Sequence, residues 1–450
     1  MKRIILIVLA LCAFTSAAYA KVLDIQALTT PKGIRVWLVE DHTLPVLALS
    51  FAFRSAAATD PVNKQGVSQL LSNTLDEGAG DIKAREYQGL LRDNAIDLGF
   101  DSSRDYFSGD VRTLLRHQDA ALKLLKLALM SPRFDAEAVE RMKQANLSRI
   151  RSSLDDPSWI GARIMNDRIY EGHPYALNVG GTLSGMAALN AEDLRAARAR
   201  HFARGQLVVG IAGDIKKEDA LRIVDQVFGD LPATVKKAAI SESVMPAFGK
   251  PIFYYRNQPQ TNLSMAWPGI DVHDPDYYAA VVMDYIFGGG GFSSRLMDEV
   301  REKHGLTYGI YSSMANLVHA SRYMAGGSML PKNVAPTIAM VKKIANDMLT
   351  TDVTDDELQA AKDYLTGSMP LRFSSSTNIS GALVSLQLNN RPVTALDDFN
   401  GKINAVTPAD IKRAAARIFK TQPVIVLVGA KPDGLDVETV TTLPNVTGGK

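Results

Sequence analysis

Short segments that alternate apolar and polar residues open each half of the chain, and they have the period of β-strands. These segments are Ile34–Val39 and Val46–Phe53 in the first half, and Ile252–Arg256 and Asn262–Pro268 in the second. Long stretches in which apolar residues recur with helical spacing follow in each half, as in 135–153 and 333–349. Strands that are grouped and then followed by helices predict α+β domains, each with a sheet that helices cover on one face.

The chain contains an internal repeat at a constant spacing of 217 residues. Residues Asp193–Gly213 align without a gap with Asp410–Ala430, and both copies have the pattern of a helix, a turn and a buried strand. Identical residues occupy these paired positions: Asp193 and Asp410, Ala197 and Ala414, Ala199 and Ala416, Arg200 and Arg417, Phe202 and Phe419, Val209 and Val426. A chance match is the alternative, but the spacing is close to half the chain, so we predict two copies of one α/β unit.

These patterns divide the chain into five predicted segments. They are a signal peptide (1–20), an N-terminal domain (21–230), a linker (231–251), a C-terminal domain (252–432) and a polar tail (433–450). The linker is placed where periodicity is weak and prolines recur, at Pro232, Pro246 and Pro251. We expect the tail after Pro432 to be loosely held, because it is polar.

The first residues have the pattern of a secretory signal. Lys2 and Arg3 precede the apolar run Ile4–Phe14, and Ala18 and Ala20 supply small residues before a cleavage site at Lys21. Cleavage leaves 48 basic and 48 acidic residues, which excludes the basic footprint of a nucleic-acid-binding protein. The only cysteine leaves with the signal, so the exported chain forms no disulfide. We therefore expect a periplasmic protein with no nucleic-acid partner and no membrane span.

Two common catalytic patterns are missing from the sequence. No two of the seven histidines lie closer than 15 residues, so no helix can present a His pair to zinc. They are His42, His117, His173, His201, His273, His304 and His319. A Gly-x-Ser-x-Gly motif of serine hydrolases is also absent. A zinc site built from distant histidines remains an alternative.

A run of four glycines, Gly288, Gly289, Gly290 and Gly291, lies in the densest motif of the chain. A phosphate-binding loop would need a strand before the glycines and a Lys after them. The preceding segment instead has helical spacing, and no Gly-Lys-Ser/Thr follows. The glycines are therefore interpreted as a flexible connection between two helices. Ser293 or Ser294 can cap the second helix, Gly305 ends it, and 306–312 has the pattern of a strand.

This arrangement places Arg301 in the last turn of a helix and Tyr308 early in the following strand. A guanidinium offers a fixed fork of donors to a carboxylate or carbonyl, and a phenol offers one donor to a developing oxyanion. Such a pair could hold a peptide and stabilise a tetrahedral intermediate. On the residues alone, a solvated Arg301 and a half-buried Tyr308 are the simpler interpretation.

The context of this pair resembles the insulinase/pitrilysin (M16) zinc peptidases, in particular their small two-domain bacterial branch. The similarity comprises Phe292–Leu296, Arg301–Tyr308, Gly180–Thr182, Val208–Gly213 and Val227–Pro232, and it runs over nearly the whole exported chain. It implies two homologous α/β domains, each a mostly antiparallel sheet covered by helices. Together they would form one half of a clam-shell heterodimer.

One departure from the family pattern concerns the zinc helix. Active members carry His-x-x-Glu-His on the first helix of the N-terminal domain, just after a Gly that matches Gly66. Here Gln69 and Asn73 occupy the two His positions, and Ser72 occupies the general-base position. The family's third ligand, a Glu, falls at Arg149 or Ile150. Neutral amides are poor zinc ligands and a cation repels the metal, so we expect no cofactor in this chain and Zn²⁺ in a partner subunit.

The resemblance implies that the chain is the subunit of a heterodimeric peptidase that lacks zinc. Arg301 would then bind unfolded peptide near the scissile bond, and Tyr308 would polarise the carbonyl or stabilise the oxyanion. Gly288–Gly291 would let this region adjust around substrate, or would form a tight connection only. Two alternatives are a scaffold protein without a catalytic role and a chain that is active alone through an unrecognised site.

Overall fold

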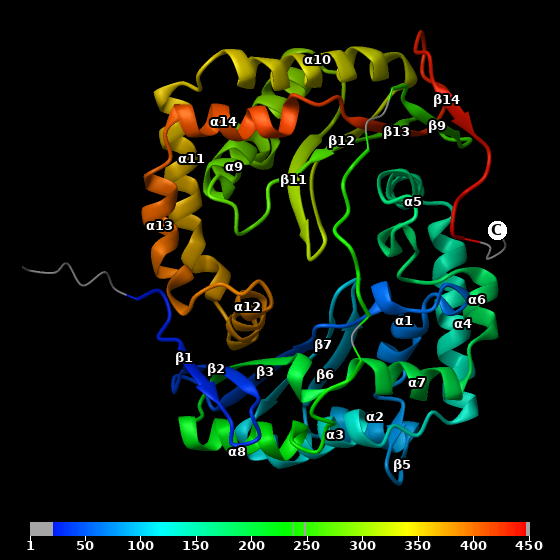
Figure 1. Ribbon diagram of the computed structural model, residues 1–450, viewed down its shortest axis with the longest axis vertical. Helices are drawn as coiled ribbons and strands as arrows, with labels where there is room; N and C mark the ends of the chain where they lie inside the picture. Colours follow the sequence, from blue (N-terminus) through cyan, green and yellow to red (C-terminus); the bar gives the residue numbers. More distant parts are fainter. Residues whose placement is uncertain (1–20, 237, 247–248, 447–450) are drawn as a thin grey trace, which may run out of the picture.

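The computed structural model describes residues 21–236, 238–246 and 249–446, so the predicted signal peptide lies outside the described residues. Two six-stranded sheets lie in the two halves of the molecule (Figure 1). The first has the order β1-β2-β8-β3-β7-β6, and only its β2–β8 pair is parallel. Its strands are β1 Gln26–Thr29, β2 Arg35–Glu40, β3 Val46–Phe53, β6 Asp97–Ser102, β7 Phe107–Leu114 and β8 Leu207–Gly213. A separate hairpin pairs β4 Gly78–Ala79 with β5 Ile82–Lys83.

The second sheet has the order β11-β12-β10-β13-β9-β14, and β9 is parallel to both of its neighbours. Its strands are β9 Ile252–Tyr255, β10 Thr261–Pro268, β11 Ile310–Leu317, β12 Ala320–Met329, β13 Val424–Gly429 and β14 Glu438–Val440. The fold is therefore α+β, with two mostly antiparallel sheets as the sequence predicts. The expected strand 306–312 starts later, at Ile310, so Tyr308 precedes it.

Fourteen α-helices are described, eight in the first half and six in the second. Those of the first half are α1 Val67–Ser72, α2 Ala84–Asp93, α3 Gln118–Met130, α4 Ala136–Ser153, α5 Pro157–Ile169, α6 Leu183–Ala188, α7 Ala191–His201 and α8 Lys217–Phe228. Those of the second half are α9 Tyr277–Asp284, α10 Pro331–Thr350, α11 Asp355–Ser368, α12 Ser376–Leu388, α13 Asp397–Asn404 and α14 Pro408–Phe419. Among the described helices, none is both long and apolar enough to cross a bilayer.

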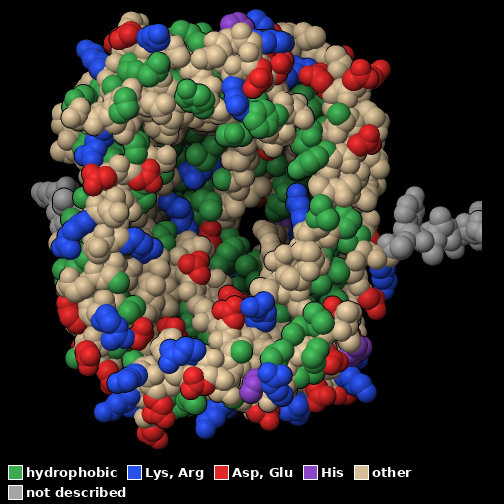
Figure 2. Space-filling view, turned by 180° about the vertical axis from the view of Figure 1, so that it is seen from behind, with side chains coloured by type: hydrophobic (Ala, Val, Ile, Leu, Met, Phe, Trp, Pro, Cys, Tyr) green, Lys and Arg blue, Asp and Glu red, His purple; other side chains and the backbone are tan. Residues whose placement is uncertain are grey.

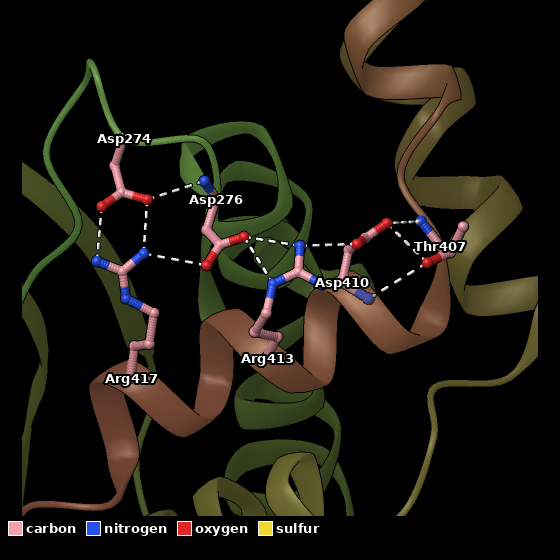
Figure 3. Close-up of polar contacts among 6 residues, drawn as sticks. All are labelled: Asp274, Asp276, Thr407, Asp410, Arg413 and Arg417. Atoms are coloured by element: carbon pink, nitrogen blue, oxygen red, sulfur yellow. Dashed lines mark hydrogen bonds and ion pairs between the residues drawn. The ribbon is translucent and has the colours of Figure 1, made fainter.

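The repeat corresponds to the units α7–β8 and α14–β13. Both helices begin with a capping box, formed by Asn190 with Asp193 and by Thr407 with Asp410, at the repeat spacing of 217 residues. Two arginines of α14 fix it to the segment before α9: Arg417 contacts Asp274 and Asp276, and Arg413 contacts Asp276 (Figure 3). Arg413 also contacts Asp410 in the first turn of α14. These guanidinium hydrogen bonds lower the pKa of Asp276.

Each sheet is also covered by a helix from the other half of the chain. Helix α12 packs on β8 and β3 of the first sheet, where Gln387 Nε2 donates to Val209 O at 2.8 Å. A Cβ on Gly210 would lie only 2.3 Å from Ser380 O, so this close approach requires glycine. Helix α5 of the first half packs on β13 and β10 of the second sheet through Ile160 and Ile164 (Figure 1).

The described part of the C-terminal tail, up to Val446, is attached to both halves, so the expectation that it is loosely held is wrong there. Strand β14 adds to the second sheet beside β9. Beyond it Val446 is buried, and its carbonyl accepts a hydrogen bond from Leu183 N at 2.7 Å. Backbone pairing and one apolar side chain are enough to order a polar segment, and neither produces a periodic pattern.

Candidate functional site

The helix that the resemblance assigns to the zinc position is α1, and all of its residues are buried. Its N-cap is Gly66, whose φ is +88° and where a Cβ would lie 2.7 Å from Gly181 Cα. Only glycine fits this left-handed and crowded position. Asp60 accepts a hydrogen bond from Ser68 N at 3.1 Å and so satisfies the first turn of the helix. Burial raises the pKa of Asp60 to about 6.

The degenerate zinc positions lie together in a hydrogen-bonded network. Gln69 Nε2 donates to Asn73 Oδ1 at 3.0 Å and to Ser72 Oγ at 3.2 Å. Ser72 Oγ donates in turn to Gln69 O at 2.9 Å. Asn73 ends α1 and faces α4, where Asn146 Nδ2 lies 3.5 Å from its Oδ1. The side chains therefore satisfy one another.

Asn146 is a member of this network that the sequence analysis missed. Its Oδ1 accepts a hydrogen bond from Arg149 Nη2 at 2.8 Å, so it links Arg149 to the residues on α1. Ile150, the other candidate for the third-ligand position, is in the hydrophobic core. Asn146 lies one helical turn before Arg149 and Ile150, and that spacing is the only signal that could have revealed it.

These donors do not fit Zn²⁺. Structural and catalytic zinc sites use thiolates, imidazoles and carboxylates, whereas this network offers two amides, a hydroxyl and a guanidinium in contact through a third amide. Across the described residues, no group of three or more His, Cys, Asp or Glu side chains is placed to hold a metal ion. The network at α1 is therefore not a set of residues suited to bind Zn²⁺.

Arg301 lies in a π-helical segment of the second half, η8 Met297–Lys303. Its guanidinium carbon is 4.6 Å from the centroid of the Phe292 ring, and its Nε lies 3.3 Å from Glu302 Oε1. The helical turn that leads to it starts where Ser294 Oγ accepts from Met297 N, and Gly305 ends it with φ +60°. Stacking on an aromatic ring orients a guanidinium while its donors stay available.

Tyr308 is 85% exposed and lies in the short loop between η8 and β11. Two side chains hold this loop: Thr307 Oγ1 donates to Ser328 O at 2.7 Å, and Asn333 Nδ2 donates to Leu306 O at 2.9 Å. Arg301 and Tyr308 line the same surface pocket of about 380 Å³. The pair is thus neither buried nor part of the core, and both groups can reach a molecule in this pocket.

The glycine run is closely packed rather than open. The segment η6 Tyr285–Gly289 is π-helical, and a Cβ on Gly288 would lie 2.6 Å from Ser312 Oγ. A Cβ on Gly289 or Gly290 would also lie 2.6 Å from the nearest atom, whereas Gly291 has free space and a φ of +58°. Packing and backbone conformation are therefore a sufficient reason for glycine at these positions, and their flexibility stays a prediction.

Behind the glycine run, Asp284 joins this segment to the sheet. Its Oδ1 accepts hydrogen bonds from Ser312 Oγ at 2.6 Å and from Tyr323 OH at 2.8 Å. Burial raises the pKa of Asp284, while these two donors favour its charged form. The contact fixes the end of α9, directly before η6, against β11 and β12, and the loop with Tyr308 leads into β11.

Comparison with known proteins gives the family of the chain. Residues 188–365 match a family model described as the peptidase M16 inactive domain. A solved structure of a peptidase M16 inactive domain from Pseudomonas fluorescens is 30% identical, with a TM-score of 0.85, and the match covers 92% of this chain and 100% of that one.

Two bacterial proteins extend the comparison. The chain is 28% identical to the "non-peptidase homolog YmxG" of Helicobacter pylori, over 74% of this chain and 77% of that protein. It is 22% identical to the "uncharacterized zinc protease YmxG" of Bacillus subtilis, over 90% and 98% of the two chains. With the two-sheet fold and the altered zinc helix, these matches show that the chain belongs to the peptidase M16 family, as a member that resembles its inactive domain.

Proposed function

We propose that this chain is the subunit without zinc in a periplasmic, heterodimeric M16-type endopeptidase that acts on unfolded peptides. Its partner would be an M16 subunit that carries His-x-x-Glu-His and holds the Zn²⁺. The observation that carries the proposal is the shared pocket of Arg301 and Tyr308, in a chain whose own α1 lacks zinc ligands. The location in the periplasm rests on the predicted signal sequence alone.

In this role the chain supplies donors to a reaction centre held by its partner. The planar guanidinium of Arg301 would bind a peptide carbonyl or carboxylate near the scissile bond. The Tyr308 hydroxyl would donate a hydrogen bond to the oxyanion that forms when water attacks the carbonyl. Thr307 and Asn333 would act as positioning residues, because they hold the loop that carries Tyr308.

The test is peptide turnover by the assembled complex. Arg301→Ala or Tyr308→Phe is expected to lower kcat/KM by about 10²–10³, the usual cost of one oxyanion donor. Tyr255→Phe and Arg222→Ala are matched controls, since both residues are exposed and lie outside the pocket. Unchanged turnover by a complex that assembles normally would refute the catalytic role.

A scaffold protein of the M16 fold is the second candidate function. One observation in its favour is that Gln69, Ser72 and Asn73 form hydrogen bonds with one another. Another is that the Helicobacter pylori relative is described as a non-peptidase homolog. A scaffold role predicts that the Arg301 and Tyr308 variants leave turnover by a bound peptidase intact. It also predicts that removing the whole subunit changes assembly rather than chemistry.

A further inference from the structure

A second pocket lies where the two halves of the molecule meet. Its volume is about 470 Å³, and the turns of the β6–β7 and β11–β12 hairpins both line it, the first through Arg104 and Asp105 and the second through Val318. These turns are in contact, because Val318 N donates to Asp105 Oδ2 at 3.2 Å. Figure 2 shows that the molecule is hollowed between its halves and that Lys and Arg side chains lie on the wall of the hollow.

Arg104 is held in this pocket with most of its donors free. Its guanidinium carbon is 6.0 Å from the centroid of the Tyr175 ring, and its Nε donates to Tyr175 O at 3.3 Å. Within the described part of the chain, Nη1 and Nη2 have no hydrogen-bond acceptor, and no carboxylate oxygen lies within 4.0 Å of the guanidinium. Burial lowers the pKa of Arg104. The outer fork of the guanidinium, formed by Nη1 and Nη2, therefore has a fixed direction and no hydrogen-bond partner among the described residues.

Further positive charge lies behind Arg104. Arg163 is 4% exposed, and burial together with Arg104 lowers its pKa to about 10. The Nε atoms of Arg163 and Arg322 are buried and have no hydrogen-bond partner among the residues the structure describes. Their other donors are partly used, because Arg163 Nη2 donates to Ala176 O and Arg322 Nη1 donates to Asn166 Oδ1 at 2.7 Å. These acceptors are neutral.

The charges of Asp105 and Asp167 partly offset the burial of Arg104 and Arg163, but neither carboxylate forms an ion pair with these guanidinium groups. Asp105 accepts hydrogen bonds from Tyr175 OH and Val318 N, so its oxygens are already engaged. Arg54 also lines the pocket; it donates to Leu388 O, Gln387 O and Asn390 Oδ1 and has no carboxylate partner within the described ranges. A buried cation without a partner is costly, and a carboxylate that binds a guanidinium fork through two hydrogen bonds would offset that cost.

We propose that this pocket binds a carboxylate of the peptide substrate through the free fork of Arg104, an inference that rests on the proposed function. Strand β11 connects the pocket of Arg301 and Tyr308 with the pocket of Arg104, so its length gives the distance between the two pockets. It starts two residues after Tyr308 and ends one residue before Val318. At ~3.3 Å per residue, an extended peptide needs about ten residues to cover that length. The acidic group therefore lies about ten residues from the scissile bond.

Peptide binding to the full isolated chain tests this inference without any turnover. The probes are fluorescent, unstructured Ala/Ser/Gln peptides of about 16 residues, long enough for the spacing given above. One carries a single Glu and an amidated C-terminus, its twin carries Gln instead, and a third carries Gln and a free C-terminal carboxylate. Fluorescence anisotropy at constant ionic strength is expected to show that a carboxylate strengthens binding at least tenfold over the Gln amide peptide.

Arg104→Gln is expected to remove the preference, and Arg104→Lys to remove most of it, because an ammonium lacks the planar fork. The matched control Arg112→Gln alters an exposed arginine of the same half and should keep the preference. Tighter binding of the Glu peptide assigns the site to an acidic side chain, and tighter binding of the free-carboxylate peptide assigns it to a chain end. Either outcome supports the inference.

Three outcomes would overturn it. Equal binding of all three peptides by the unaltered chain would remove the anionic subsite and leave the roles of Arg301 and Tyr308 standing. A preference that persists in folded Arg104→Gln and Arg104→Lys variants would exclude Arg104 as its source. Failure to bind any peptide would overturn both this inference and the substrate-binding role in the proposed function.

Discussion

His201 shows how one buried side chain makes stability depend on pH. It is fully buried, with Nε2 2.8 Å from Ser68 Oγ and Nδ1 2.8 Å from Ser55 Oγ. Ser68 Oγ donates to Asp60 and so accepts from Nε2, which leaves Nδ1 as the acceptor of a neutral ring. Burial lowers the pKa of His201 from 6.5 to about 3. The unfolded chain therefore binds a proton near pH 5 that the folded chain does not.

We expect this difference to cost stability as the pH falls from about 6.5 towards 3, by at most ~1.4 kcal/mol per pH unit. Asp60 has the opposite effect on stability between its ordinary pKa of 3.8 and about pH 6. Burial raises its pKa, so in this range the folded chain binds the proton that the unfolded chain has released. Comparing the chain with His201→Gln by urea unfolding at several pH values separates the two effects. The variant should lose less stability on acidification, and parallel curves would contradict the role of His201.

The residues of the candidate site were predictable to different degrees. Gln69, Ser72 and Asn73 follow from the register of one short helix, and the structure places them in one network. Arg301 and Tyr308 follow from one continuous motif and line one pocket. Asn146 and Arg104 could not be found in this way, because their contacts with Asn73 of α1 and with Tyr175 arise from long-range packing that no local pattern records.

At the scale of elements, strands with strong alternation were predicted well, as Val46–Phe53 shows. The segment 306–312 was predicted as a strand, but side-chain hydrogen bonds from Thr307 and Asn333 hold its first part as a loop. The exchange of α5 and α12 between the halves was not predicted either. Helical periodicity reports that a face is buried, and it does not say against which sheet.

The packing of η6 makes Gly288 a sensitive position. A Cβ there would lie 2.7 Å from Leu296 Cδ1 and 2.8 Å from Ser312 N, so the strand or the π-helical segment must shift. Gly288→Ala is expected to lower the free energy of unfolding by about 1–3 kcal/mol, as overpacked core substitutions do. Urea unfolding is the measurement.

Gly367→Ala is the matched control, because Gly367 lies in α11 with no atom within 4 Å of an added Cβ. Alanine is the better helix former, so this variant should be neutral or more stable by up to ~1 kcal/mol. If Gly288→Ala were as stable as the control, the glycine run would not be explained by packing. The flexible interpretation of Gly288–Gly291 would then gain support.

At the scale of the whole molecule, the exchanged helices tie the two halves into one cooperative unit. Helix α12 belongs to the second half in sequence but buries Leu383 against the first sheet, while α5 buries Ile160 against the second. The tail adds a third connection through Val446. If either half unfolded alone, the sheet of the other half would lose a cover and expose apolar surface, which is unfavourable.

We therefore expect both halves to unfold in a single transition at equilibrium. Trp37 lies in β2 of the first sheet and Trp267 in β10 of the second, so each can report on one half once Trp159 of α5 is replaced by Phe. Two single-tryptophan variants follow: Trp159→Phe with Trp267→Phe keeps Trp37, and Trp159→Phe with Trp37→Phe keeps Trp267. Their fluorescence in urea should give coincident midpoints after correction for the stability of each variant. Two separated midpoints would mean that α5 and α12 can detach without unfolding the sheets they cover. The halves would then behave as independent domains that a partner could open.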